Sequence, residues 1–175
     1  ADFRDPWTNI DFYDKLKLTM WADKKHRRLE RNVLKNASKI ITVSKSWAND
    51  LLNISGINPI VINNGFDSTD FKNAGKLPLD VKFSITHAGS LNKDRNPFIL
   101  WKVLEELVKV NSDFASKLEI KLIGPIDITV KEALKKHNLM QYTRLIDSLP
   151  HKEVIPHLIT SQVLLLPLNN VHNIE

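Results

Sequence analysis

A short loop between a β-prone run and a helical pattern combines glycine with two cations. The run KFSITHAGSLNKDRNPFILWKVL contains Gly89, Ser90, Lys93 and Arg95 in this gap. A glycine turn that joins a strand to a helix aims backbone N–H groups and the helix N-terminus at an anion. Arg95 could fork onto two phosphate oxygens, whereas Lys93 would act as a point charge. The loop therefore fits a phosphate site, with a solvated turn as the alternative.

A second group of charged side chains lies in the stretch DFRDPW. Arg4 and Asp5 follow a short β-prone pair, and Pro6 ends the strand. Charged groups at a strand end could orient the hydroxyl of an acceptor or stabilise charge that develops during a reaction. The alternative is that Arg4 and Asp5 pair with each other or cap the following helix.

Two further strand-end turns are candidates for ligand contacts. Gly124 and Pro125 end one apolar run, and the sequence DSLP, residues 147–150 and including Leu149, ends the next. Loops at the carboxyl ends of parallel strands bound ligands in open α/β sheets. Each stretch also reads as an ordinary β-to-α turn.

β-branched runs alternate with amphipathic stretches along the whole chain, which predicts an α/β fold with parallel sheets. A long helical region includes Leu29, Val33 and Ala37 at a spacing of four, typical of one apolar face. A second helix is expected near residues 47–52, capped by Ser44 or Ser46 and ended by Gly56. We expect strands at 39–44, 59–63, 82–88, 118–124, 143–147 and 162–168, helices at 97–110, 130–138 and 151–159, and a turn at 64–65.

Individual aromatic and histidine side chains are assigned no chemistry. Trp101 and Leu104 are expected in the core of their helix. His87 lies in a buried strand and is expected to be a hydrogen-bonded core residue, while His151 is expected to begin a helix.

Composition excludes several classes of protein. The 175 residues include no cysteine, so disulfides and thiolate metal sites are excluded, and six scattered histidines give no zinc-like pairing. We expect no metal. The apolar runs are shorter than a membrane helix requires, and the opening residues do not resemble a signal peptide, so we expect neither insertion nor secretion. A formal charge of +5 favours anionic partners.

A basic run occupies Lys24 to Lys35, with Trp21 at its head. It either rests on an anionic membrane leaflet or forms a solvated helix face. The solvated face is the favoured reading, because Asp23 and Glu30 interrupt the run. Nucleic acid is not expected as a partner, because Trp21 is the only stacking aromatic near the run.

Seven segments follow one another along the chain: DFRDPW, LERNVLKNASKIITVSKSWANDLL, VINNGFDSTDF, ITHAGSLNKDRNPFILWKVLEEL, LIG, LIDSLPHKEVIPHL and VLLLPLNN. Similar segments occur in the same order in GT-B retaining glycosyltransferases of the family 4 kind, so the chain resembles that family. The resemblance implies two Rossmann-like domains with flanking helices, present here as a partial GT-B architecture. Residues 1–66 would be the end of the N-terminal domain, 67–79 the linker, and 80–175 the first part of the nucleotide-sugar-binding domain.

The resemblance also implies roles for the residues above. Gly89, Ser90, Lys93 and Arg95 would contact the donor diphosphate, with Ser90 standing where many relatives have an arginine. Gly124 and Leu149 would border the nucleobase, and Arg4 and Asp5 would lie beside the reacting sugar. No cofactor is implied beyond the nucleotide-sugar donor.

The implied activity is that of a bacterial hexosyltransferase-type enzyme in cell-surface polysaccharide synthesis, with a glycan or lipid-linked acceptor. The segment alone is expected to be inactive and, because a truncated sheet leaves edges, to self-associate as a homodimer. A cytoplasmic location is expected, with peripheral contact at the inner membrane face if the basic run binds lipid. The alternatives are a sugar-nucleotide epimerase of the same fold and a non-catalytic anion-binding Rossmann-like module.

Overall fold

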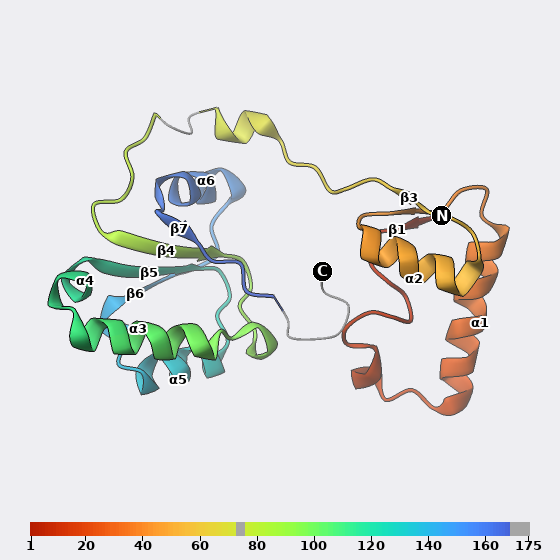
Figure 1. Cartoon of the computed structure of the whole chain (residues 1–175), viewed down its shortest axis with the longest axis horizontal. Coiled ribbons are helices and arrows are strands. Elements are labelled where there is room, and N and C mark those ends of the chain that lie inside the picture. The colour runs from red at the N-terminus through yellow and green to blue at the C-terminus, as the bar shows by residue number, and fades with distance from the viewer. Residues whose placement is uncertain (73–75, 169–175) are drawn as a thin grey trace. The chain divides into compact units, whose positions relative to one another are not determined.

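The computed structural model describes residues 1–72 and 76–168. The chain divides into two compact units, the first spanning Ala1–Phe66 and the second beginning at Asp67 (Figure 1). Each unit has its own parallel sheet and its own apolar core.

The first unit is built on three short parallel strands in the order β1-β2-β3. Its core consists of four buried side chains, Phe3, Leu34, Ile40 and Leu51. The elements in chain order are β1 (Asp2–Phe3), the 3-10 helix η1 (Tyr13–Leu16), α1 (Met20–Asn36), β2 (Ile41–Thr42), α2 (Lys45–Ser55) and β3 (Ile60–Val61).

The ends of α2 follow the sequence signals. Ser44 is the N-cap, and its hydroxyl accepts a hydrogen bond from the backbone N–H of Trp47. Gly56 ends the helix with a φ of 74°, a left-handed conformation that a residue with a Cβ adopts at a cost. Both expectations are confirmed.

The turn expected at Asn64 and Gly65 is wrong. Residues 62–67 form no turn, and Gly65 does not have a positive φ. The side chain of Asn63 donates a hydrogen bond to the carbonyl of Val43, which directly follows β2. This bond holds the segment after β3 beside the segment after β2. The chain therefore continues from β3 without a turn.

The inward face of α1 also differs from the expectation. Leu29 and Val33 are 38% and 41% exposed, whereas Leu34 and Glu30 are buried. A spacing of four residues fits a helical face, but here the face turned to the core lies one position further along. Glu30 can occupy it because Thr8 satisfies both carboxylate oxygens.

The second unit is a four-stranded parallel sheet in the order β6-β5-β4-β7. Helices α3 and α5 lie on one side of this sheet, and α6 lies on the other (Figure 1). This placement follows from the strand order, because the crossover from β6 to β7 runs in the opposite direction to the two before it. The elements are η2 (Ser68–Phe71), β4 (Phe83–Ala88), η3 (Lys93–Arg95), α3 (Phe98–Val110), α4 (Ser112–Lys117), β5 (Leu118–Ile123), α5 (Ile128–Lys136), η4 (Met140–Tyr142), β6 (Thr143–Ile146), α6 (His151–Thr160) and β7 (Val163–Leu164).

The main core of the second unit lies between the sheet and α3 and α5. Trp101 and Leu104 are buried in it, as expected, together with Ile120 and Leu122 of β5. Burying an aliphatic side chain of this kind stabilises a fold by about 1.5 to 3 kcal/mol.

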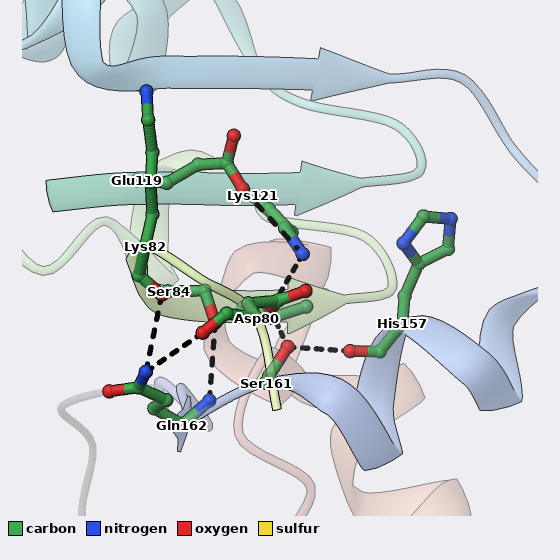
Figure 2. Close-up of polar contacts among 9 residues, drawn as sticks. Asp80, Lys82, Ser84, Glu119, Lys121, His157, Ser161 and Gln162 are labelled. Carbon is green, nitrogen blue, oxygen red and sulfur yellow. Dashed lines mark hydrogen bonds and ion pairs between the residues drawn. The ribbon is translucent and has the colours of Figure 1, made fainter. Parts of the chain in front are cut away.

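Polar side chains close the opposite face of the same sheet, under α6. Lys121 is almost fully buried, and its ammonium contacts the carboxylate of Asp80 at 2.5 Å and that of Glu119 at 3.6 Å. Gln162, just after α6, donates from its side chain to the carbonyl of Asp80 and from its backbone to the hydroxyl of Ser84 (Figure 2). These contacts fix the segment that enters β4 against β5.

Several strands lie where the sequence predicts them but are shorter than predicted. The expected strands at 39–44, 59–63 and 162–168 form ladders of only two residues each, and α4 was not expected. His151 begins α6, as expected. His87 lies in β4 and its Nδ1 contacts the carbonyl of Leu165 at 3.1 Å, which confirms a hydrogen-bonded core residue.

Candidate functional site

The loop after β4 is held in place by backbone hydrogen bonds to the loop after β5. The N–H of Leu91 donates to the carbonyl of Pro125, and the N–H of Asp127 donates to the carbonyl of Leu91. Leu91 itself is fully buried, so it anchors the loop from below. The exposed residues on either side of Leu91 are thereby presented at the carboxyl edge of the sheet.

Two glycines in left-handed conformations lie against each other at this edge. Gly89 has a φ of 131° and Gly124 a φ of 111°. A Cβ added to Gly124 would lie 2.9 Å from the carbonyl oxygen of Gly89, closer than van der Waals contact permits. The close approach of the two loops therefore requires glycine at position 124.

A cavity of about 430 Å³ opens beside the two glycines, at the carboxyl ends of β4, β5 and β6. Its apolar lining includes Leu91 and Ile146. Its polar lining consists of Ser90, Asn92, Asp127, Lys131 and Asp147. Because the carboxyl ends of parallel strands are where open α/β sheets bind their ligands, this cavity is the candidate site.

One carboxylate of the cavity is held ionised by its neighbours. Asp127 caps α5, and its Oδ1 accepts hydrogen bonds from the hydroxyl and the backbone N–H of Thr129 at 2.6 and 2.8 Å. These bonds, helped by the charge of Lys93, hold the pKa of Asp127 below its ordinary value. The Asp127 carboxylate is therefore used in capping the N-terminus of α5. Lys131, near the start of α5, is a cation that lines the cavity.

The predicted donor-binding residues fall into two groups. Ser90 and Gly124 line the cavity, and Gly89 packs against Gly124. Lys93 and Arg95 lie in η3 and are exposed, and Leu149 lies in the loop between β6 and α6; none of these three is among the described residues that line the cavity. Asn92 caps η3 by accepting the N–H of Arg95, which fixes the start of this turn.

Arg4 and Asp5 lie in the other unit, at the carboxyl end of β1. The Nε of Arg4 contacts Asp2, not Asp5, at 3.4 Å, and both side chains of this pair are more than half exposed. Arg4 borders a smaller cavity of about 180 Å³ together with Asn63 and Asn64. Arg4 therefore pairs with Asp2, and the alternative pairing of Arg4 with Asp5 is not found among the described contacts.

Three polar side chains that line the larger cavity were not proposed from the sequence: Asn92, Asp127 and Lys131. The pattern Asp-x-Thr after Gly124 and Pro125 is an N-cap signature and could have located Asp127 at the start of a helix. Lys131 then follows one helical turn later, on the side that faces the strand ends. Asn92 carries a weaker signal, because a polar residue before a charged turn is common.

The described residues lack two other kinds of feature. They contain no cluster of His, Asp and Glu with the geometry of a metal site. None of their helices is long and apolar enough to cross a membrane.

Similar proteins are found by structure and not by sequence. No protein-family model matches the chain, and no curated protein matches it. Among solved structures, sucrose-phosphate synthase from Thermosynechococcus elongatus has a TM-score of 0.60 at 16% identity, covering 86% of this chain and 40% of that one. Anabaena HepE in complex with UDP and glucose has a TM-score of 0.60 at 14% identity, covering 86% and 42%.

A third similar structure is a variant of S. aureus TarM in complex with UDP, α-GlcNAc-glycerol and fondaparinux. Its TM-score is 0.58 at 17% identity, covering 78% of this chain and 27% of that one. The present chain thus spans between about a quarter and two fifths of these proteins. The class that the fold defines is that of Rossmann-like α/β domains, in the form found in GT-B glycosyltransferases.

Proposed function

We propose that this chain is part of a glycosyltransferase whose second unit binds the nucleoside-diphosphate portion of a sugar donor. The observation that carries the proposal is the cavity at the carboxyl ends of β4, β5 and β6, bordered by the glycine loop at Gly89. The fold is shared with structures that hold UDP or UDP-glucose, which supports the same ligand class here.

The charges around this loop suit a diphosphate. Gly89 leaves room for a ligand to approach the backbone, and Lys93 and Arg95 stand on the exposed turn that follows. A guanidinium contacts two adjacent phosphate oxygens at once, so Arg95 is the proposed principal cation. Lys131 supplies a third positive charge from the cavity wall.

The chemical role of these cations follows from the reaction. As the bond between the sugar and the diphosphate breaks, negative charge grows on the leaving diphosphate. Cations fixed beside it stabilise the transition state more than the ground state. No further cofactor is proposed, because the leaving group is already activated.

The finer features are proposals for the whole protein. They are retaining, family 4-type hexosyl transfer to a glycan or lipid-linked acceptor, in bacterial cell-surface polysaccharide synthesis. Arg4 and Asp5, at the carboxyl end of β1, are proposed to act on the acceptor side, and Gly124 and Leu149 near the nucleobase. Cytoplasmic location and self-association as a homodimer belong to the same proposal.

Calorimetric titration of this 175-residue chain with UDP, GDP and ADP tests the donor site. We expect Arg95→Ala to weaken binding of the preferred nucleotide by about 1.5 to 3 kcal/mol, the scale of a charge-assisted hydrogen bond. Arg95→Lys should recover part of this loss, and Lys93→Ala should cost less. Lys102→Ala, an exposed lysine on α3, is the matched control and should bind as the wild type does.

Two outcomes would contradict the proposal. If no nucleoside diphosphate binds, the second unit is not a donor site. If nucleotide binding is unchanged in Arg95→Ala but lost in Lys131→Ala, the loop after β4 only connects β4 to α3, and Lys131 is the cation that binds the phosphate.

A further inference from the structure

The segment that follows β3 contains the only Asn-Gly pair of the sequence, Asn64 and Gly65. Between β3 and η2, residues 62–67 form neither helix, strand nor turn (Figure 1), and all of them are exposed. Among the described residues, neither the side chain of Asn64 nor the N–H of Gly65 takes part in a hydrogen bond. The pair can therefore change conformation without breaking a contact of the fold.

Gly65 leaves its own backbone nitrogen open to attack on a neighbouring group. It has no Cβ to shield that nitrogen, and a Cβ built at this position would meet no atom within 4 Å, so the surroundings do not confine it either. A bond between this nitrogen and Cγ of the Asn64 side chain closes a small, unstrained ring. Two groups joined in this way react with the advantage of an intramolecular reaction.

Asn63, the preceding residue, differs from Asn64 in both respects. The residue after it is Asn64, whose Cβ shields the backbone nitrogen. Its own side-chain amide donates a hydrogen bond to the carbonyl of Val43 at 2.9 Å, which restrains the amide. Two asparagines of one exposed segment therefore differ in the two factors that control the reaction of a side-chain amide with the next backbone nitrogen.

We propose that Asn64 is a site of spontaneous deamidation. The backbone nitrogen of Gly65 loses its proton to the solvent and bonds to Cγ of Asn64, and the side-chain nitrogen leaves as ammonia. Water then adds to one of the two carbonyl carbons of the cyclic imide and opens the ring. The product is an aspartyl or an isoaspartyl residue at position 64, and the reaction consumes one water for each ammonia that it releases.

Deamidation adds a negative charge to the cavity of about 180 Å³ in the first unit. Asn64 lines this cavity together with Asp2 and Arg4, and the Nε of Arg4 contacts Asp2 at 3.4 Å. A second carboxylate offsets the charge of the guanidinium, so the deamidated cavity attracts anionic ligands less than the unmodified one does. This inference does not rest on the proposed glycosyl transfer, because the reaction needs only this segment and water.

Ageing of the full 175-residue chain at neutral and at mildly alkaline pH tests the proposal. Peptide mapping by mass spectrometry should find NH₂ replaced by OH at Asn64. The modified fraction should grow with time, and faster at the higher pH, because the attacking nitrogen must lose its proton. Asn63, in the same tryptic peptide, is the internal control and should react at least about tenfold more slowly, a difference of about 1.4 kcal/mol in activation free energy.

Gly65→Ala isolates the effect of the missing Cβ. It should slow the modification of Asn64 by about tenfold or more. The variant should keep its fold, because the added Cβ meets no atom within 4 Å. Wild type unfolded in guanidinium chloride gives the rate without structure, and the folded chain should react within about threefold of it, since the pair has no hydrogen bond to open first.

Cation-exchange chromatography gives a second readout. The aged protein should contain a more acidic form that elutes with the variant Asn64→Asp. A rate at Asn64 equal to that at Asn63, or one that Gly65→Ala leaves unchanged, would overturn the proposal. So would a folded chain in which Asn64 reacts more slowly than in the unfolded chain by about tenfold or more, since the structure would then protect the pair.

Discussion

At the scale of single residues, the contact between Gly89 and Gly124 is the most constrained feature of the candidate site. We expect Gly124→Ala to lower the free energy of unfolding by about 2 to 4 kcal/mol, from the left-handed conformation and the overlap with the Gly89 carbonyl. Gly65→Ala is the control, because its Cβ would meet no atom within 4 Å and its φ is not positive. Urea unfolding of the two variants measures the difference, and similar stabilities would contradict the close approach.

Glu105 makes the stability of the second unit depend on pH. Hydrogen bonds from Lys109 at 2.7 Å and His137 at 2.6 Å hold its pKa at about 2, compared with an ordinary value of 4.5. Because the pKa is lowered in the folded state, the stabilisation is complete above about pH 4.5 and is lost as the pH falls towards 2. Wild type should therefore lose more stability over this range than Glu105→Gln.

The control for this prediction is Glu106→Gln, which removes an exposed carboxylate from the next position of α3. Its unfolding free energy should follow the pH profile of the wild type. Urea titrations at several pH values give the profiles. If Glu105→Gln and wild type showed parallel profiles, the two hydrogen bonds would not stabilise the ionised carboxylate.

At the scale of elements, the buried contact between Lys121 and Asp80 joins β5 to the segment that enters β4 (Figure 2). Burial acts to raise the pKa of Asp80, but hydrogen bonds from Lys121 and Ser84 outweigh it and hold the pKa below its ordinary value. The contact is therefore between a carboxylate and an ammonium.

A double-mutant cycle measures this contact. Lys121→Met and Asp80→Asn should each destabilise the fold, and the double variant should be less destabilised than the sum, with a coupling of about 1 to 3 kcal/mol. Lys121→Met should cost more than Asp80→Asn, because its partners Asp80 and Glu119 are both left without the ammonium. Additive losses in urea unfolding would show that the two side chains do not interact.

The same elements show how far the sequence determines the structure. The alternation of β-branched and amphipathic runs predicted parallel sheets, and local signals predicted the ends of α2 at Ser44 and Gly56. The inward face of α1 could not be predicted, because Glu30 is buried only where Thr8, 22 residues away, meets its carboxylate. Burial of a charge depends on such distant partners, which local patterns do not record.

The candidate site follows the same rule. Gly89, Ser90 and Gly124 could be proposed from the sequence because glycine at a strand end is a local signal. Of these three residues, Ser90 and Gly124 line the cavity. Lys131 was not recognised, because its place in the cavity depends on the packing of α5 beside the ends of β4 and β5. The length of each strand could not be predicted from local patterns either, because a strand pairs only as far as the adjacent strand extends.

At the scale of the whole molecule, the two units differ in how much core they contain. Four buried apolar residues form the core of the first unit, and its described strands are two residues long. Eleven buried apolar residues form the main core of the second, around the six-residue strands β4 and β5. Since stability follows buried apolar area, the first unit should open at a lower free energy than the second.

Hydrogen exchange under increasing denaturant tests this difference. Amides of β4 and β5 should remain protected at concentrations where those of β2 and α2 already exchange, because the opening of the first unit leaves the core of the second intact. Leu34→Ala should reduce protection in the first unit alone, and Leu122→Ala in the second alone, since each side chain is fully buried in its own core. A single cooperative transition, with both variants lowering protection throughout the chain, would show instead that the two cores fold as one.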